Sequence, residues 1–207
     1  MSEISAFQVA REIVRRTERQ EVNSVALQKL CFFSFSWYAH LTGRRLYPES
    51  TWAMQRGPVV GDLLTAHSGK AEVSVDLLEK SIDIWMLPRE IEDSYVIDVI
   101  DSVFDAYYKH FDPWTLEKIS HLEPTWKSAW DRRKGKRAAM PGDTLQDYYL
   151  THAPATEGVL EDGTSFDLEI DLPSRLVTVA DSDLLDTLLD APGKAHEPFV
   201  ERVLALK

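Results

Sequence analysis

The most concentrated apolar stretch of the chain runs from Ser24 to Gly43 and reads SVALQKLCFFSFSWYAHLTG. Residues three and four positions apart share one face of a helix, and here large apolar side chains fall on more than one face. Such a helix belongs in the centre of a fold, with other elements covering it. Ser24 is the expected N-cap and Gly43 the expected C-terminal stop. The uncharged part, Leu30 to Leu41, is shorter than the roughly 18 residues of a membrane span, so we expect a buried helix.

Other helices follow from apolar stripes at helical spacing and from caps. The stripes predict helices over residues 5–20, 91–111 and 144–150. Asp112 followed by Pro113 is a typical N-cap and first turn, and Pro124 marks another break. We therefore expect two short helices between residues 112 and 130.

Extended segments are expected in three places. Short strands should flank a turn at 48–50, and the alternation of Ile82, Ile84 and Met86 predicts a strand. Residues 159–170 resemble a hairpin that turns at 162–163. Between the first two places, Gly57 makes a corner and Pro58 is expected to open a helix that ends near residue 68. For residues 73–78, a strand and a short helix both remain open.

These elements predict a mainly α fold: a compact helical domain around a central buried helix, with small antiparallel β elements. We place this domain at residues 1–152 and a C-terminal extension at 153–207. The extension should contain the hairpin and two short leucine-rich helices, near 181–190 and 196–207. It either docks on the domain or binds a partner.

Charge makes the extension distinctive. The chain has 207 residues and a net charge of −11. From Ala153 onward there are 12 acidic and 4 basic residues (−8), against 22 acidic and 19 basic (−3) before it. This balance argues against general nucleic-acid binding, which depends on Lys and Arg. The basic run at 131–143 is a local exception. It is expected to be a flexible link that contacts RNA or an acidic partner, or a solvated loop that pairs with the acidic extension.

Candidate chemistry is sparse. The single cysteine, Cys31, excludes an intramolecular disulfide and is expected to be a buried apolar residue in a reducing, cytoplasmic protein. The N-terminus lacks the apolar core of a secretory signal. His121-x-Glu123 lacks the cysteines of a zinc deaminase, so we interpret His121 as a hydrogen-bonded residue at a helix joint. We predict no catalytic residue, metal or cofactor.

Three blocks of sequence resemble the signature of the Panacea domain, which is also called GepA-like or SocA-like. The first is Leu27-Gln28-Lys29-Leu30 running into Trp37-Tyr38 and Leu41-Thr42-Gly43, similar to LQKLLYFAQGW-x-LALTG. The second is Trp52-Ala53 followed by Gly57-Pro58-Val59-Val60, with one more intervening residue than the family pattern. The third is Ser120-His121-x-Glu123 with Trp126, where Ser120 replaces the usual Thr and Pro124 is displaced. The blocks span about residues 7–149.

The resemblance implies an antitoxin: a mostly helical, cytoplasmic, bacterial and often phage-associated protein that neutralises a toxin encoded beside it, without catalysis. One branch of the family delivers the toxin to a AAA+ protease, so an adaptor remains the alternative. An unrecognised hydrolase or nuclease is the third hypothesis. No membrane partner is expected.

Two surfaces are candidates for the toxin. One is the face near Trp52, Arg56 and Trp126. The other is the acidic extension, where carboxylates would steer a basic partner and leucines would supply an apolar centre. The extension residues proposed for contact are Leu184, Leu185, Leu188, Leu189, Phe199 and Val203. Deletion of 171–207 is predicted to leave a folded domain that no longer protects cells.

Overall fold

The computed structural model describes residues 4–174, which form a mainly α fold with small antiparallel sheets. The helices are α1 (Ala6–Arg15), α2 (Ser24–Thr42), α3 (Gly61–Ala66), α4 (Val75–Ile84), α5 (Ser94–Val103), the π-helical turn η1 (Phe104–Tyr108), α6 (Pro113–His121), α7 (Pro124–Asp131) and α8 (Gly142–Thr151). The strands are β1 (Glu21–Asn23), β2 (Thr51–Met54), β3 (Gly57–Val60), β4 (Glu72–Ser74), β5 (Arg137–Met140), β6 (Glu157–Val159) and β7 (Ser165–Asp167). The fold class expected from the sequence is thereby confirmed.

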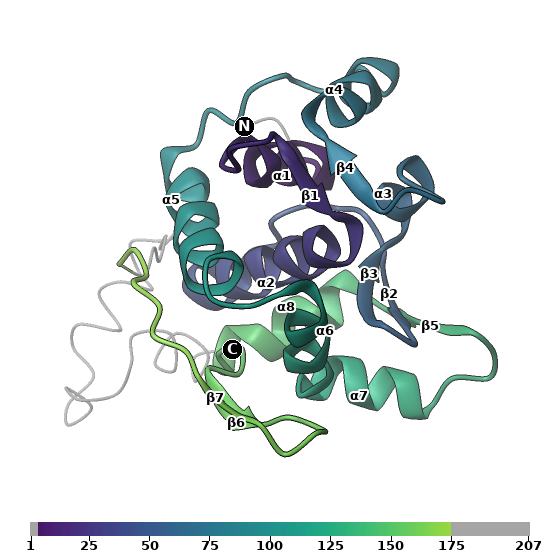
Figure 1. Cartoon of the computed structure of the whole chain (residues 1–207), viewed down its shortest axis with the longest axis vertical. Coiled ribbons are helices and arrows are strands. Elements are labelled where there is room, and N and C mark those ends of the chain that lie inside the picture. Colours follow the sequence, from purple (N-terminus) through teal and green to yellow (C-terminus); the bar gives the residue numbers. More distant parts are fainter. Residues whose placement is uncertain (1–3, 175–207) are drawn as a thin grey trace, which may run out of the picture.

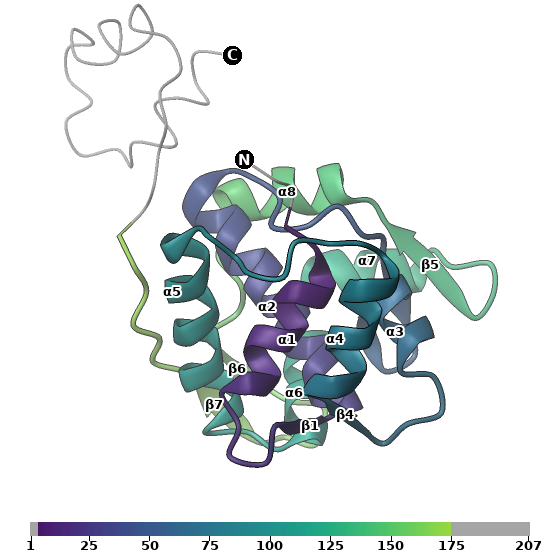
Figure 2. The same ribbon diagram turned by 90° about the horizontal axis from the view of Figure 1, so that it is seen from above.

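Helix α2 is the centre of the fold, as its sequence predicts. Every residue from Ala26 to Ala39 is buried. The helices α1, α5, α6 and α8 all contact α2, and Figures 1 and 2 show it crossing the middle of the molecule among them. An element that is apolar on all sides removes the most surface from water when it is enclosed in this way. Within residues 4–174, no helix combines the length and the apolar character that crossing a membrane requires.

The ends of α2 are set by local hydrogen bonds. Its N-cap is Asn23 and not Ser24, because the Asn23 side chain accepts from the amides of Val25 (3.0 Å) and Ala26 (3.4 Å). The error is one residue, and both side chains are good caps. Gly43 ends the helix in the left-handed conformation, with φ of 67°, which confirms the predicted stop.

A three-stranded antiparallel sheet in the order β3-β2-β5 covers one side of α2. The prediction that Pro58 opens a helix is wrong: Pro58 lies in β3 opposite Ala53, and α3 starts only after Val60. Since β3 is an edge strand, the missing amide of Pro58 does not interrupt the sheet. The sequence also gave no sign of β5, which the basic link contains.

The predicted strand at Ile82–Met86 is also wrong. Residues 75–84 are helix α4, capped by the Ser74 hydroxyl, which accepts from the Leu77 amide. Val75, Leu78 and Ile82 share its buried face at helical spacing, whereas the apparent alternation falls partly on exposed positions. Residues 73–78, for which the sequence allowed either a strand or a short helix, contain both: β4 is followed directly by α4.

The first part of the C-terminal extension packs against the helical domain. Strands β6 and β7 form the predicted hairpin, and Gly163 has a φ of 83° in its turn. Leu160, Phe166 and Leu168 are buried in the main core. The boundary at 152/153 stays a prediction. The two leucine-rich helices expected after residue 174 lie outside the described residues.

Candidate functional site

The three signature blocks meet on one side of α2. The Lys29 ammonium, from the first block, donates to the carbonyl of Pro58 in the second (3.0 Å). The Val60 amide donates to the Gln28 side-chain oxygen (2.8 Å), so two neighbouring α2 residues hold the edge strand β3. Trp126, from the third block, donates through its indole N–H to the Met54 carbonyl (3.0 Å). The blocks therefore fasten α2, the sheet and α7 to one another.

Position 57, at the start of β3, requires glycine for two reasons. Its φ is +90°, which L side chains rarely adopt. A Cβ atom at this position would lie 2.4 Å from the Ser120 hydroxyl oxygen and 2.7 Å from the Lys29 nitrogen. The backbone of β3 thus approaches α2 and α6 at a distance that leaves no room for a methyl group.

Lys29 is the most strongly perturbed cation of the junction. Its side chain is 1% exposed and forms no ion pair within residues 4–174. Burial lowers its pKa from 10.5 to about 7; the nearby Arg56 charge acts in the same direction, and Glu117 opposes both. The net effect is a lysine that loses its proton near neutral pH while its N–H still donates to β3.

The His121-x-Glu123 pair is structural in this fold. The His121 ring stacks on Trp126, with centroids 4.1 Å apart, and its Nδ1 lies 3.3 Å from a Glu161 oxygen. Glu123 is buried and accepts from the Tyr149 hydroxyl (2.7 Å) and the Ala155 amide (2.9 Å). Burial raises the Glu123 pKa. In the part of the chain that the structure describes, no group of three His, Cys, Asp or Glu residues is placed to hold a metal.

Cys31 is fully buried in α2, and burial raises the pKa of its thiol. A thiol in this environment stays protonated, so it has little nucleophilic character at neutral pH. This agrees with the interpretation of Cys31 as a small apolar core residue.

The three residues of the first predicted contact surface differ in exposure and do not form one exposed patch. Trp52 is half-buried beneath the Arg137 guanidinium, which lies 4.1 Å from its ring centroid. Arg56 is exposed in the β2–β3 turn, and its guanidinium lies 5.0 Å from the ring centroid of Trp114. Trp126 is only 6% exposed, so its ring is buried and offers little surface to a partner. The predicted contact residues of the extension, Leu184, Leu185, Leu188, Leu189, Phe199 and Val203, lie outside the described residues.

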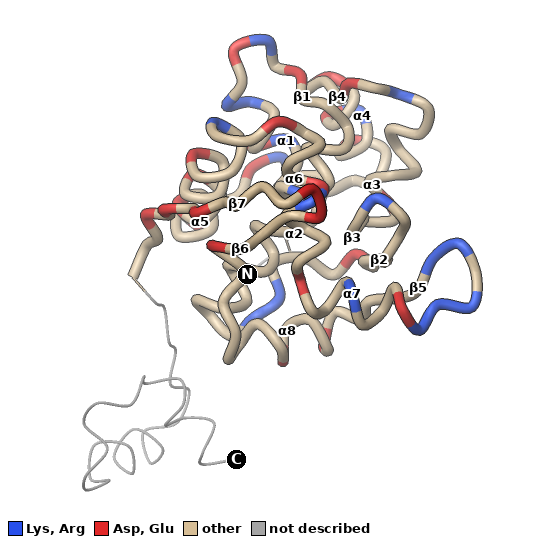
Figure 3. Tube along the Cα trace, turned by 60° about the horizontal axis from the view of Figure 1, so that its bottom comes forward, with Lys and Arg blue, Asp and Glu red and all other residues tan. Residues whose placement is uncertain are grey.

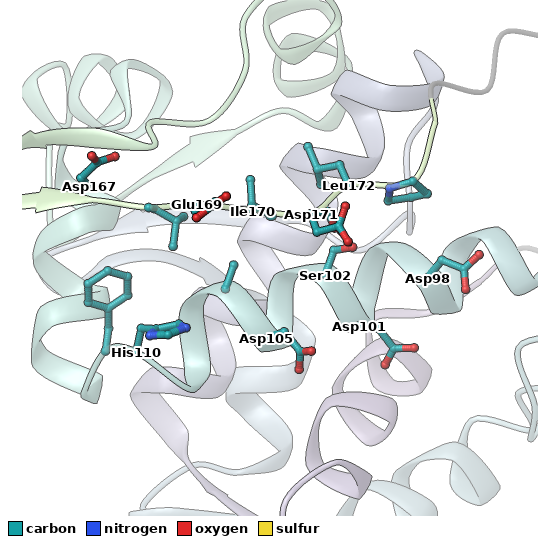
Figure 4. A pocket seen from close by; sticks show the side chains of 14 residues that line it. Asp98, Asp101, Ser102, Asp105, His110, Asp167, Glu169, Ile170, Asp171 and Leu172 are labelled. Carbon is teal, nitrogen blue, oxygen red and sulfur yellow. The ribbon is translucent and has the colours of Figure 1, made fainter.

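A larger concave surface lies on the opposite side, between α5–η1 and the segment that follows β7. This acidic groove has a volume of about 1190 Å³. Figure 4 shows Asp98, Asp101 and Asp105 along the helical wall, with the extension running alongside. The acidic residues of the groove are Asp98, Asp101, Asp105, Asp167, Glu169 and Asp171. Figure 3 shows the same concentration of acidic positions along α5 and the chain after β7.

Four of these six carboxylates lack a cation within the described residues. Asp101 pairs with Arg16, and Asp105 pairs with Lys109 (2.6 Å). The others, Asp98, Asp167, Glu169 and Asp171, form no ion pair in residues 4–174. Several unpaired charges of one sign on a concave surface produce a negative potential that attracts a basic segment.

The acidic residues of both groove walls are visible in the sequence, but the groove itself is not. The aspartates of α5 fall opposite its apolar stripe, and the acidity of the extension is plain from its composition. Their meeting depends on the hairpin packing its Phe166 edge to face against Phe111, with ring centroids 6.2 Å apart and an angle of 85° between the ring planes. A contact between residues 55 positions apart has no local signal in the sequence.

The comparison with protein families agrees with the junction of the signature blocks. A family model described as antitoxin SocA-like, Panacea domain, matches residues 27–127. No match was found among curated proteins or among solved structures. The matched family is one of antitoxins, which supports a role in a toxin–antitoxin pair. Residues 27–127, which make up just under half of the chain, are therefore similar to the Panacea domain of SocA-like antitoxins.

Proposed function

We propose that the protein is a non-catalytic, cytoplasmic antitoxin that neutralises the toxin encoded beside it by binding a basic segment of that toxin in the acidic groove. The observation that carries this proposal is the set of four carboxylates without cations on one concave surface: Asp98, Asp167, Glu169 and Asp171. A toxin segment rich in Lys or Arg would supply the missing charges.

The groove has the chemistry of an interface and little of an active site. Its walls combine carboxylates with apolar side chains such as Phe111, Leu168 and Ile170. Charges at the rim speed the encounter of two proteins, and apolar contacts at the centre supply most of the binding energy. The buried polar residues of the signature blocks hold β3 and α7 in place, so their role is structural support.

Removing the charges of the groove tests the proposal. In the triple variant Asp98→Asn, Asp167→Asn, Glu169→Gln, three exposed carboxylates become neutral with little change of shape. Each exposed ion pair contributes about 0.2–1 kcal/mol, so the loss of three pairs should lower the affinity for the toxin about 3- to 150-fold. Affinity is measured by calorimetry with the purified product of the adjacent gene, and protection by growth of cells that express both proteins.

A matched control carries the same change of charge elsewhere. Asp62, Asp76 and Asp147 are exposed and form no ion pair within the described residues. Their replacement by Asn should leave affinity and protection unchanged. If both triple variants bind the toxin as the wild type does, the groove is not the contact surface.

Two further measurements separate direct neutralisation from its alternatives. The toxin half-life should be the same in cells with and without the AAA+ protease, because an adaptor requires the protease and a direct inhibitor does not. A chain truncated after Ser174 keeps the whole groove. Its full protection would assign the contact to the groove, and loss of protection with normal folding would assign it to residues 175–207.

A further inference from the structure

The loop between α7 and β5 carries a second concentration of charge, of the opposite sign. This basic arm, residues 132–137, contains Arg132, Arg133, Lys134, Lys136 and Arg137. All five side chains are exposed, and none forms an ion pair within residues 4–174. Elsewhere in the described chain most arginines are paired, as Arg11, Arg15, Arg16, Arg45 and Arg89 are. An unpaired basic arm is therefore an exception in a chain of net charge −11.

Two arginines of the arm lie over tryptophan rings. The Arg133 guanidinium lies 3.5 Å from the ring centroid of Trp130 and donates to the Trp130 carbonyl (2.7 Å). The Arg137 guanidinium lies 4.1 Å from the ring centroid of Trp52. Stacking fixes the planar guanidinium while leaving other N–H groups free for carboxylates. Both groups thus lose little conformational entropy when they bind an anion.

The arm cannot pair with the acidic groove of its own chain. Figures 1 and 3 show the β5 loop on one side of the molecule and α5, with the chain after β7, on the other. No ion pair joins the two surfaces within the described residues. Each copy therefore presents an unpaired basic projection on one side and an unpaired acidic groove on the other.

We propose that the basic arm of one copy docks into the acidic groove of a second copy, so that the protein associates head to tail. Five cations of the arm would meet four carboxylates of the groove, Asp98, Asp167, Glu169 and Asp171. The two surfaces are different patches, so the contact is heterologous and each dimer keeps one free arm and one free groove. Repetition of the contact closes a ring or extends a chain.

An acidic protein surface fits the arm better than a nucleic acid does. The remainder of the chain is strongly negative, and this charge would repel a polyphosphate that lies along the surface. A second copy offers its carboxylates in a groove that a projecting loop can enter. Trp130 is half-buried beside the arm and would add apolar contact in the assembled state.

The inference does not require a toxin, but it shares the acidic groove with the proposed function. A basic toxin segment and the arm of a second copy would compete for the same carboxylates. Toxin binding would then convert the assembly into toxin–antitoxin complexes. Self-association is measured on the purified chain alone, so a negative result there leaves toxin binding to be judged by its own experiment.

Sedimentation velocity of the full-length chain over a range of salt and protein concentrations is the test. At low salt, the average mass should exceed the 23.6 kDa of one chain and increase with protein concentration. Near 0.5 M salt, where the screening length is about 4–5 Å, it should return to one chain. A mass of one chain at every salt and protein concentration would overturn the proposal.

Charge reversal identifies the two surfaces. An arm variant, Arg133→Glu with Arg137→Glu, and a groove variant, Asp98→Lys with Glu169→Lys, should each raise the dissociation constant of self-association at least tenfold. An equimolar mixture should regain association, because the unchanged arm of the groove variant fits the unchanged groove of the arm variant. If mixing restores association, the loss in each separate variant is not due to misfolding. If mixing does not restore it, the proposed contact between arm and groove is wrong.

Two controls complete the experiment. Lys70→Glu with Lys80→Glu reverses two exposed, unpaired lysines away from the arm and should leave self-association unchanged. A fluorescent single-stranded oligonucleotide should not bind the wild-type chain. Salt-sensitive oligonucleotide binding that disappears in the arm variant would assign the arm to nucleic acid and overturn the second copy as its occupant.

Discussion

The buried ammonium of Lys29 should make the stability of this fold increase with pH above neutrality. Burial lowers its pKa from 10.5 to about 7, and Arg56 adds to this effect against the attraction of Glu117. Below pH 7 the folded and unfolded chains both carry the proton, and the folded state bears the full cost of desolvating it. Between pH 7 and 10.5 the unfolded chain holds a proton that the folded chain has released, so the free energy of unfolding rises with pH.

The size of the effect follows from proton linkage. One proton of difference between the two states changes the free energy of unfolding by about 1.4 kcal/mol per pH unit. From pH 7 to pH 8.5, Lys29 should therefore add about 2 kcal/mol. At higher pH the sign reverses for other groups, because burial raises the pKa of Cys31, Tyr47 and Tyr107, and the unfolded chain loses those protons first.

The assay is urea unfolding of the wild type and of Lys29→Met between about pH 6 and pH 8.5. Methionine keeps the length of the side chain and removes its charge and its hydrogen bond to Pro58. The lost hydrogen bond contributes an offset that does not depend on pH, and titrations common to both proteins cancel in the difference. The wild type should gain about 2 kcal/mol on the variant between pH 7 and pH 8.5. Parallel stability curves would refute a buried lysine of low pKa.

Three other predictions concern the core, the junction and the extension. Trp37→Ala should lower the free energy of unfolding by about 3–5 kcal/mol in urea, because the ring is 3% exposed and its N–H donates to the Tyr107 hydroxyl (3.2 Å). Gly57→Ala should lower the melting temperature more than Gly69→Ala does: both have positive φ, but a Cβ at Gly69 meets nothing within 4 Å. The chain lacking residues 175–207 should unfold cooperatively in a calorimeter, since the described core lies within residues 4–174.

Several features of the fold are predictable from local sequence. The apolar content of α2 is enough to predict that the helix is buried on all sides, whichever elements cover it. The same holds for the Asp112–Pro113 start of α6, where the Asp112 carboxylate accepts from the Trp114 amide (2.9 Å). The turn at Gly163 requires a positive φ, which its sequence context indicates. At the start of α6 and at the Gly163 turn, the deciding interaction joins residues close in the chain.

The two wrong predictions, at Pro58 and at Ile82–Met86, arise where tertiary contacts override a local preference. Proline favours the first turn of a helix, yet Pro58 accepts a strand position because Gln28 and Lys29 hold the backbone of β3 from α2. The alternation at Ile82–Met86 resembles a strand, yet burial of Val75 and Leu78 selects a helix. Both outcomes depend on contacts with distant elements, and local periodicity does not contain them.

The sequence by itself determined the central helix, the mainly α class, the family resemblance and the uneven distribution of charge. Each is a property of composition or of spacing within one segment. Only the tertiary structure decided that the acidic helix α5 lies beside the acidic chain that follows β7, and that the basic arm projects from the opposite side. Charge at a binding surface is a matter of distance between side chains, and that distance is set by packing between segments far apart in the chain.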